Sequence, residues 1–335
     1  MFNPQSILDQ VSSEALSTGP AAQSDGTIDP SMIGAFPEIY DSSIIASYKS
    51  CAEQFRKQYI QHWKPKGLSV HLHAGASFAR GLEVARHEFY VEDKSSDDAI
   101  ALGLTALLAH YGSYQCPPDS AKSAERMAGA FEFYFTNYPL ELSDGHPITL
   151  PGDKRAIEFS FAHPLPIAHP VTGNPLLYVG RMDAVIHYAG GIYICDEKTT
   201  TQLGATWPRQ WDLRAQFTGY AWGCQKSGIS VDGAIVRGVS ILKTKYDTAQ
   251  SINYRPEWQI DRWYNELLEW IEDIKYNWLR RGPDTPWRHN LDHSCAEYGG
   301  CQFREACMSQ DEAPWLDVAF ERRIWNPLLR IETKI

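Results

Sequence analysis

The sequence predicts an α/β fold in which a mixed central sheet is flanked by helices. Two observations carry this prediction. A block between residues 156 and 243 contains β-branched and aromatic runs separated by turn residues, as is typical of strands, with one helical segment among them. Around that block, apolar residues recur at helical spacing. The order strand, hairpin, helix, strand predicts a mixed α/β core.

Four consecutive segments are expected along the 335 residues. Residues 1–40 are rich in Ser, Gly, Pro, Asp and Ala, which predicts a flexible tail. Residues 41–145 form a helical region, residues 146–282 hold the sheet and a long helix, and residues 283–335 form a C-terminal region organised by cysteines. The expected helices are 43–63, 74–89, 97–111, 120–138, 212–226 and 257–281, and the last of them stops at Gly282-Pro283.

The expected strands are 156–161, 176–188, 192–198 and 231–243. The second and third are joined by Ala189-Gly190-Gly191, a combination typical of a hairpin turn.

The bulk composition excludes several classes of protein. The formal net charge of −10 argues against a surface coated with basic residues for duplex binding, although a local basic groove remains compatible with it. There is no run of 18 apolar residues and no secretion signal at the N-terminus, so we expect a cytoplasmic protein without a membrane span. Motifs for ATP, dinucleotide or serine-hydrolase chemistry are missing from the sequence.

The predicted hairpin carries the acidic residues that point to metal chemistry. Asp196 and Lys198 lie on one face of their strand and Glu197 lies on the other, because side chains alternate along a strand. Pairing brings Asp183 beside Asp196, and two close carboxylates suit Mg²⁺ or Mn²⁺. The backbone carbonyl of Glu197 is a further candidate ligand, and Lys198 is placed to act on a water molecule. The alternative is a solvated strand face without a metal.

An ordered set of motifs resembles the RecB-like branch of the PD-(D/E)xK nuclease superfamily. The set consists of Glu158, Gly180-Arg181-Met182-Asp183, Asp196-Glu197-Lys198, Gln216 and Tyr220. The resemblance implies a restriction-endonuclease-like core and a Mg²⁺- or Mn²⁺-dependent DNA nuclease, an exonuclease by expectation, that acts in replication, recombination or repair. A stand-alone chain of this kind is also similar to phage-encoded nucleases, which implies the host cytoplasm and partner proteins of replication or recombination.

The resemblance also implies roles for single residues. Asp183 and Asp196 bind the metal, Lys198 is catalytic, and Glu158, Gln216 and Tyr220 support the active site. Arg181 is a candidate for DNA contact. Several members have a histidine ligand four residues after a glycine. Here Ala79 follows Gly75 at that distance, and His71 and His73 lie just upstream, so His73 is the candidate ligand and a structural or surface role for both histidines is the alternative. The expected substrate is single-stranded DNA or DNA with free ends. A non-catalytic DNA-binding or assembly protein that keeps the nuclease fold is the alternative.

Cys295, Cys301 and Cys307 fall within thirteen residues and point to a metal site. Iron–sulfur members of the same branch have one further cysteine near the N-terminus, and Cys51 matches it. The resemblance therefore implies a [4Fe–4S] cluster held by four cysteines, with Zn²⁺ as the alternative. The other three cysteines, Cys116, Cys195 and Cys224, are expected in the core.

Basic residues alternate with aromatic residues in the first helical region. Arg56 and Lys57 lie next to Phe55 and Tyr59, a pattern that suits the binding of single-stranded DNA. An ordinary helix surface explains the same pattern equally well.

Overall fold

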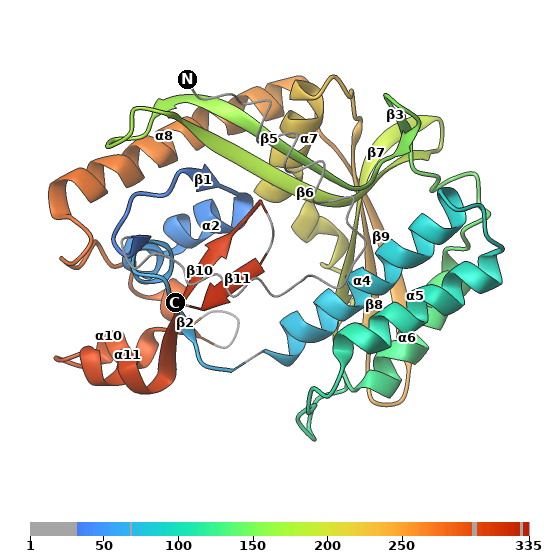
Figure 1. Ribbon diagram of the computed structural model, residues 1–335, viewed down its shortest axis with the longest axis horizontal. Coiled ribbons are helices and arrows are strands. Elements are labelled where there is room, and N and C mark those ends of the chain that lie inside the picture. Colours follow the sequence, from blue (N-terminus) through green and yellow to red (C-terminus); the bar gives the residue numbers. More distant parts are fainter. Residues whose placement is uncertain (1–31, 68, 297–299, 329–330, 335) are drawn as a thin grey trace. The chain divides into compact units, whose positions relative to one another are not determined.

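The computed structural model describes residues 32–67, 69–296, 300–328 and 331–334 (Figure 1). Most of the tail expected at 1–40 lies outside these residues. The chain forms two compact units that interleave along the sequence. The first comprises Met1–Gly67, Phe161–Gly180 and Arg262–Ile335, and the second comprises Leu68–Ser160 and Arg181–Asp261. This division differs from the four consecutive segments expected from composition.

The main sheet has six strands in the order β1-β6-β7-β8-β9, with β5 also paired to β6. The strands are β1 (Ile39–Tyr40), β5 (Ile157–Ala168), β6 (Pro175–Tyr188), β7 (Gly191–Thr200), β8 (Gly233–Ile241) and β9 (Tyr246–Tyr254). β6 and β7 are antiparallel, β7 and β8 are parallel, and β8 and β9 are antiparallel. The expected α/β fold with a mixed sheet flanked by helices is therefore confirmed in outline.

The β6–β7 hairpin turns through Ala189 and Gly190, whose φ angles are 46° and 81°. Two positive φ values in a two-residue loop match the right-handed twist of the paired strands. The turn fixes the register, with Tyr188 opposite Gly191 and Ala184 opposite Cys195. The parallel step from β7 to β8 passes through the 3-10 helix η3 (Pro208–Trp211) and α7 (Ala215–Lys226).

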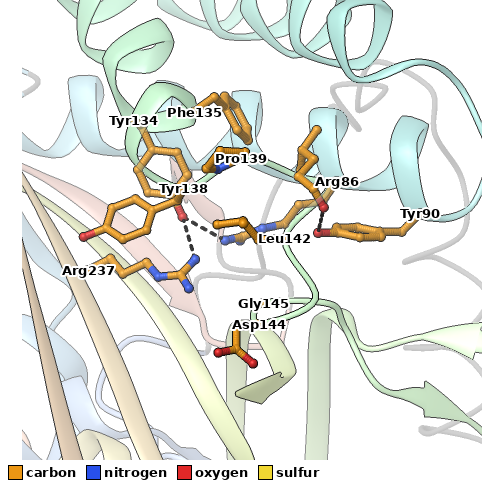
Figure 2. Close-up of a pocket in the computed structure, with 11 residues that line it drawn as sticks. Arg86, Tyr90, Tyr134, Phe135, Tyr138, Pro139, Leu142, Asp144, Gly145 and Arg237 are labelled. Atoms are coloured by element: carbon orange, nitrogen blue, oxygen red, sulfur yellow. Dashed lines mark hydrogen bonds between the residues drawn. The ribbon is translucent and has the colours of Figure 1, made fainter. Parts of the chain in front are cut away.

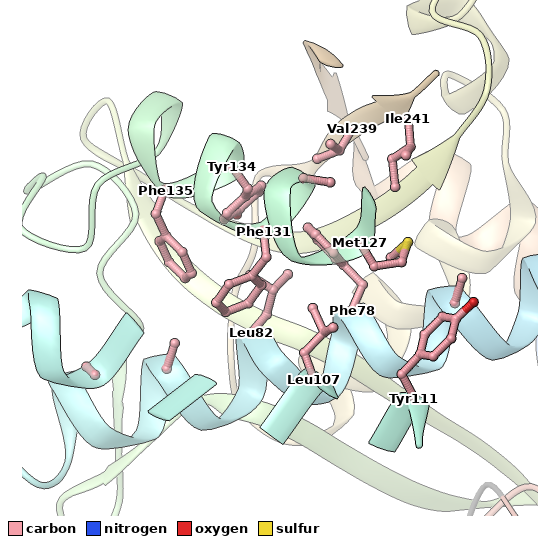
Figure 3. Close-up of a cluster of buried hydrophobic side chains, with 14 of the residues drawn as sticks. Phe78, Leu82, Leu107, Tyr111, Met127, Phe131, Tyr134, Phe135, Val239 and Ile241 are labelled. Atoms are coloured by element: carbon pink, nitrogen blue, oxygen red, sulfur yellow. The ribbon is translucent and has the colours of Figure 1, made fainter. Parts of the chain in front are cut away.

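Three helices of the second unit lie side by side: α4 (Val70–Tyr90), α5 (Ser96–Tyr111) and α6 (Ala124–Asn137) (Figure 1). α4 and α5 approach so closely at Gly81 and Gly103 that only glycine fits. A Cβ on Gly103 would lie 2.6 Å from the carbonyl oxygen of Gly81. Aromatic and aliphatic side chains fill the space between these helices and β8 (Figure 3). Its buried members include Phe78, Leu82, Leu107, Tyr111, Met127, Phe131, Tyr134, Phe135, Val239 and Ile241.

The first unit gathers segments from both ends of the chain. It contains α2 (Ser42–Ser50), α3 (Ala52–Phe55), the π-helix η2 (Arg56–Ile60), most of α8 (Glu257–Arg281), α9 (His293–Ala296), α10 (Arg304–Met308) and α11 (Ala313–Ala319). A three-stranded sheet joins β2 (Trp63–Pro65), β10 (Phe320–Asn326) and β11 (Ile331–Lys334). A two-stranded sheet of β3 (Thr149–Leu150) and β4 (Lys154–Arg155) belongs to the second unit.

The helix expected at 43–63 is interrupted at Cys51, which is extended with φ −163° and ψ 121°. One continuous helix would need Cys51 in the helical region of φ and ψ, so the chain divides there into α2 and α3. The π-helix η2 then follows α3 directly. Among the helices described, none has the length and apolar character needed to cross a membrane.

Candidate active site

The two acidic strands meet as the hairpin register requires. Since Ala184 lies opposite Cys195, the next opposed pair along β6 and β7 is Asp183 and Asp196. The carboxylate of Asp183 accepts a hydrogen bond from the backbone amide of Glu197 at 2.9 Å. Asp196 is only 3% exposed, and Asp183 is half-buried. The structure therefore brings together the two carboxylates that the sequence singled out.

Negative charge accumulates around Asp183. Burial raises the pKa of its carboxyl well above the usual value, and the carboxylates of Asp196, Glu197 and Glu158 raise it further. The positive charge of Lys198 lowers the pKa of Asp183, but by less than burial and these carboxylates raise it. An excess of carboxylate charge fits a hard divalent cation, for which oxygen atoms are the preferred ligands. Within the described part of the chain, however, no three His, Cys, Asp or Glu side chains are already grouped to hold a metal ion.

Lys198 forms an ion pair with Oδ1 of Asp196. Burial would lower the pKa of Lys198, but the carboxylates of Asp196 and Asp183 outweigh it and raise the pKa above its usual value. The lysine side chain is 34% exposed, whereas that of Asp196 is 4% exposed. A protonated amine therefore stands between a buried carboxylate and solvent, where it can orient a water molecule or contact a phosphate.

Glu158 and Arg181 form an ion pair at the edge of the acidic site. Glu158 has a φ of 51°, a left-handed backbone conformation that is uncommon within a strand. Its carboxylate is close enough to raise the pKa of Asp183. Arg181 keeps 28% of its side chain exposed, which is compatible with the expected contact to DNA.

α7 places two predicted residues beside Asp196. The side-chain amide of Gln216 donates to Oδ2 of Asp196 at 3.5 Å and to the Tyr220 hydroxyl at 3.1 Å. Residues four apart lie on one helix face, so both side chains point the same way. Gln216 and Tyr220 thus lie in the site with Asp196, as expected.

Glu197 lies on the opposite face of β7 and enters a buried network that the sequence did not reveal. Its carboxylate pairs with Arg86 from α4 and accepts from the Tyr134 hydroxyl at 2.8 Å. Arg237 of β8 also reaches that hydroxyl, at 3.4 Å. Burial alone would raise the pKa of Glu197, but Arg86 and Arg237 lower it to about 2. No local signal points to this network, because Arg86 is 111 residues away from Glu197.

The expectation that His73 is a metal ligand is not supported by its position. Its Nε2 is 2.9 Å from the carbonyl oxygen of Tyr111, and its ring lies 4.3 Å from the ring of Tyr114. These contacts hold His73 at the end of α5. No described contact connects it with Asp183 or Asp196.

The prediction that Arg56 and Lys57 bind DNA is wrong, because both side chains are 1% exposed. Each forms ion pairs with Glu53 from the same helical segment and with Glu312 from the C-terminal region. Arg56 also donates to the carbonyl of Pro283 at 2.7 Å. The two cations therefore stabilise the first unit instead of meeting a ligand.

The four candidate cluster cysteines gather in the first unit. Burial raises the pKa of Cys301, and the neighbouring thiols of Cys51 and Cys295 raise it further. Burial likewise raises the pKa of Cys307 to about 11, with Cys301 and Cys51 among the contributing neighbours. The sulfur of Cys51 accepts from the backbone amide of Asn290 at 3.4 Å. Electrostatic interactions thus link thiols from both ends of the chain, and soft sulfur donors suit iron–sulfur or zinc. Among the described residues, however, no three of these thiols are already grouped closely enough to hold a metal ion.

The remaining cysteines are divided between core and surface. Cys195 and Cys224 are fully buried, as expected, whereas Cys116 is only half-buried. Cys116 lies in the loop before α6, where its thiol is 3.6 Å from the Pro117 carbonyl.

Comparisons with known proteins leave the family open. No family model matches the sequence, and no curated protein matches it. Sixteen chains of solved structures match, among them one described as "Crystal structure of SSO0001". That match has 11% identity and a TM-score of 0.27, and it covers 79% of this chain and 85% of the other. A likeness of this degree does not establish a shared fold.

Proposed function

We propose that this protein is a metal-dependent deoxyribonuclease with a restriction-endonuclease-like core. The observation that carries the proposal is the juxtaposition of Asp183 and Asp196 on paired strands, with Lys198 bound to Asp196 and Gln216 behind it. If Lys198 served only to stabilise the fold, the single carboxylate of Asp196 would be enough to pair with it. Here a second carboxylate lies beside the first and raises the local negative charge, as the high pKa of Asp183 reflects.

Asp183 and Asp196 would hold Mg²⁺ or Mn²⁺, with the carbonyl of Glu197 as a third ligand. The bound ion would neutralise phosphate charge and lower the pKa of a water molecule. The chain's own contribution is positional. The Glu197 amide holds one carboxylate oxygen of Asp183, and the Gln216 amide holds one of Asp196, so both carboxylates are fixed before a ligand arrives.

Lys198 would hold a water molecule or a phosphate oxygen at the open side of the site. Its raised pKa keeps it protonated at neutral pH, so in the metal-free protein it donates hydrogen bonds and does not take protons. Arg181, which is partly exposed beside Glu158, would contact the DNA backbone.

Cys51, Cys295, Cys301 and Cys307 would bind a [4Fe–4S] cluster, or Zn²⁺ in its place. The donor set supports this, since, in addition to burial, Cys51 and Cys295 both raise the pKa of Cys301, and Cys301 and Cys51 raise that of Cys307, although Cys51 comes from the opposite end of the chain. Such a site would tie α3 to the C-terminal helices, and we assign it a structural role.

The test is digestion of end-labelled single-stranded, double-stranded and circular DNA by the full chain with Mg²⁺, Mn²⁺ or EDTA. We expect cleavage of linear DNA only with metal, and an exonuclease leaves circular DNA intact. If Lys198 holds the water molecule, Lys198→Met should lose cleavage by about 100-fold or more while keeping DNA affinity in Ca²⁺, whereas equal losses of both would show that it holds phosphate. Binding of DNA without cleavage under any metal would favour the non-catalytic alternative.

A further inference from the structure

A small cavity lies on the Glu197 side of the sheet, within the second unit (Figure 2). Its walls come from α4, α6, the loop after α6 and β8, and the polar residues among them are Arg86, Tyr90, Tyr134, Tyr138, Asp144 and Arg237. The cavity offers about 20 Å³ to the centres of water-sized molecules. That is room for roughly one or two waters or one small ion.

Arg237 is a buried cation whose direct partners are all neutral. It is 6% exposed. Its Nε donates to Gln250 at 3.0 Å, its Nη1 donates to the Tyr134 hydroxyl at 3.4 Å, and its guanidinium carbon lies 4.5 Å from the Tyr138 ring centre. Its Nη2 makes no hydrogen bond to any residue that the structure describes. Figure 2 shows the guanidinium of Arg237 facing the other residues of the cavity wall.

The buried charges near this cavity do not balance. Arg86 donates to both carboxylate oxygens of Glu197, so the one buried carboxylate is already paired. Asp144 also lines the cavity, but it is exposed, and its Oδ1 accepts from the Ala189 amide at 3.0 Å. In the described part of the chain it forms no ion pair with Arg237. Two guanidinium groups therefore share one buried carboxylate. Burial by itself lowers the pKa of Arg237, and Glu197 is among the groups that raise it again, but no carboxylate of a described residue hydrogen-bonds to Arg237 directly.

An unpaired buried charge is costly, and proteins normally pair it or bind a counter-ion. We propose that this cavity binds one small monovalent anion, of the size of chloride, against Nη2 of Arg237. Water would supply hydrogen bonds but no compensating charge. Larger tetrahedral oxyanions need more room than one or two water molecules occupy.

The anion would also act on the acidic site. The anion would screen the repulsion between the positive charges of Arg237 and Arg86. Arg86 is the ion-pair partner of the Glu197 side chain, and the backbone amide of Glu197 donates a hydrogen bond to Asp183. Occupancy would therefore reach the acidic site only through the Glu197 backbone, since the hairpin turn already fixes the pairing of Asp183 and Asp196. This link rests on the proposed nuclease function, whereas binding of the anion does not.

Thermal melting of the full chain tests the site without reference to cleavage. Sodium chloride is titrated against sodium gluconate at constant ionic strength, since gluconate is too large for the cavity. A tenfold excess of chloride over its Kd should raise the Tm by about 2 °C. Arg237→Gln, which keeps an N–H donor but shortens the side chain and removes the charge, should abolish the dependence. Arg209→Gln, an exposed residue of the same unit, should keep it.

Asp144→Asn provides a second variant in case Arg237→Gln does not fold. The asparagine oxygen can still accept from the Ala189 amide, and loss of the nearby negative charge should shift the chloride midpoint to lower concentration. In crystals grown with bromide, an anomalous peak is expected within hydrogen-bonding distance of Arg237 Nη2. Two results would overturn the proposal and leave water as the occupant. One is a wild-type Tm that does not change with chloride concentration, and the other is a folded Arg237→Gln protein whose Tm depends on chloride as the wild-type Tm does.

Discussion

Replacement of Arg86 by methionine should destabilise the protein strongly, because it leaves Glu197 buried without its main partner. The side chains of Arg86 and Glu197 are 7% and 2% exposed. A pKa of about 2 for Glu197, against an ordinary value of 4.5, corresponds to about 3 kcal/mol of stabilisation at neutral pH. Measured costs of breaking a buried ion pair, about 3 to 5 kcal/mol, agree with that figure.

The pH dependence of this loss has a defined sign. The folded-state pKa of Glu197 is lowered, so its stabilisation is fully present above about pH 4.5 and is lost as the pH falls through about 2. The difference in unfolding free energy between wild type and Arg86→Met should therefore be about 3 kcal/mol at pH 7 and should narrow towards pH 2.5.

Denaturant unfolding at several pH values measures both effects, and α4 supplies the control. Arg80 forms an exposed ion pair with Glu83 on the same helix, with side chains 39% and 27% exposed. Arg80→Met should cost less than about 1 kcal/mol at any pH. A cost of Arg86→Met no larger than that of Arg80→Met, or a cost that is the same at pH 7 and pH 2.5, would show that Arg86 does not stabilise the Glu197 carboxylate.

Three further changes test other parts of the structure. Asp183→Asn should reduce metal-dependent cleavage by orders of magnitude yet raise the Tm of the metal-free protein at pH 7. The pKa of Asp183 is raised in the folded state, so its ionised form costs stability as the pH rises; a lower Tm contradicts this. Cys301→Ala should lower iron or zinc content and Tm, whereas Cys224→Ala should keep the wild-type metal content, and equal metal in both variants excludes Cys301 as a ligand. Lys57→Met should cost about 3 to 5 kcal/mol of unfolding free energy with unchanged DNA affinity; a stable variant with weakened DNA binding would restore the surface interpretation.

The long periodic elements could be predicted from the sequence. α4, α5 and α8 follow apolar stripes, and the β6–β7 hairpin follows β-branched runs around a glycine turn. β9 was missed because Tyr246–Tyr254 is mostly polar and is a strand by virtue of its pairing with β8. The break at Cys51 was missed because the apolar spacing continues through it.

The candidate site was predictable only where its residues are close in sequence or share a strand register. Asp183 and Asp196 met as expected, because a tight turn fixes their pairing. Arg56 and Lys57 were misread because Glu312, which helps to bury them, is more than 250 residues away. Glu53 gave the available signal, since it lies three and four residues before them on one helical face.

The central claim is that Asp183 and Asp196 hold a divalent ion that cleaves DNA, and one measurement tests it directly. Release of nucleotides from end-labelled linear single-stranded DNA is followed with Mn²⁺ for wild type, Asp196→Asn and Asp247→Asn. Asp247 is an exposed carboxylate on the same sheet and serves as the matched control. Wild type and Asp247→Asn should release nucleotides only with metal, and Asp196→Asn should be slower by orders of magnitude at an unchanged circular dichroism spectrum. Wild-type rates in a folded Asp196→Asn protein would contradict the account.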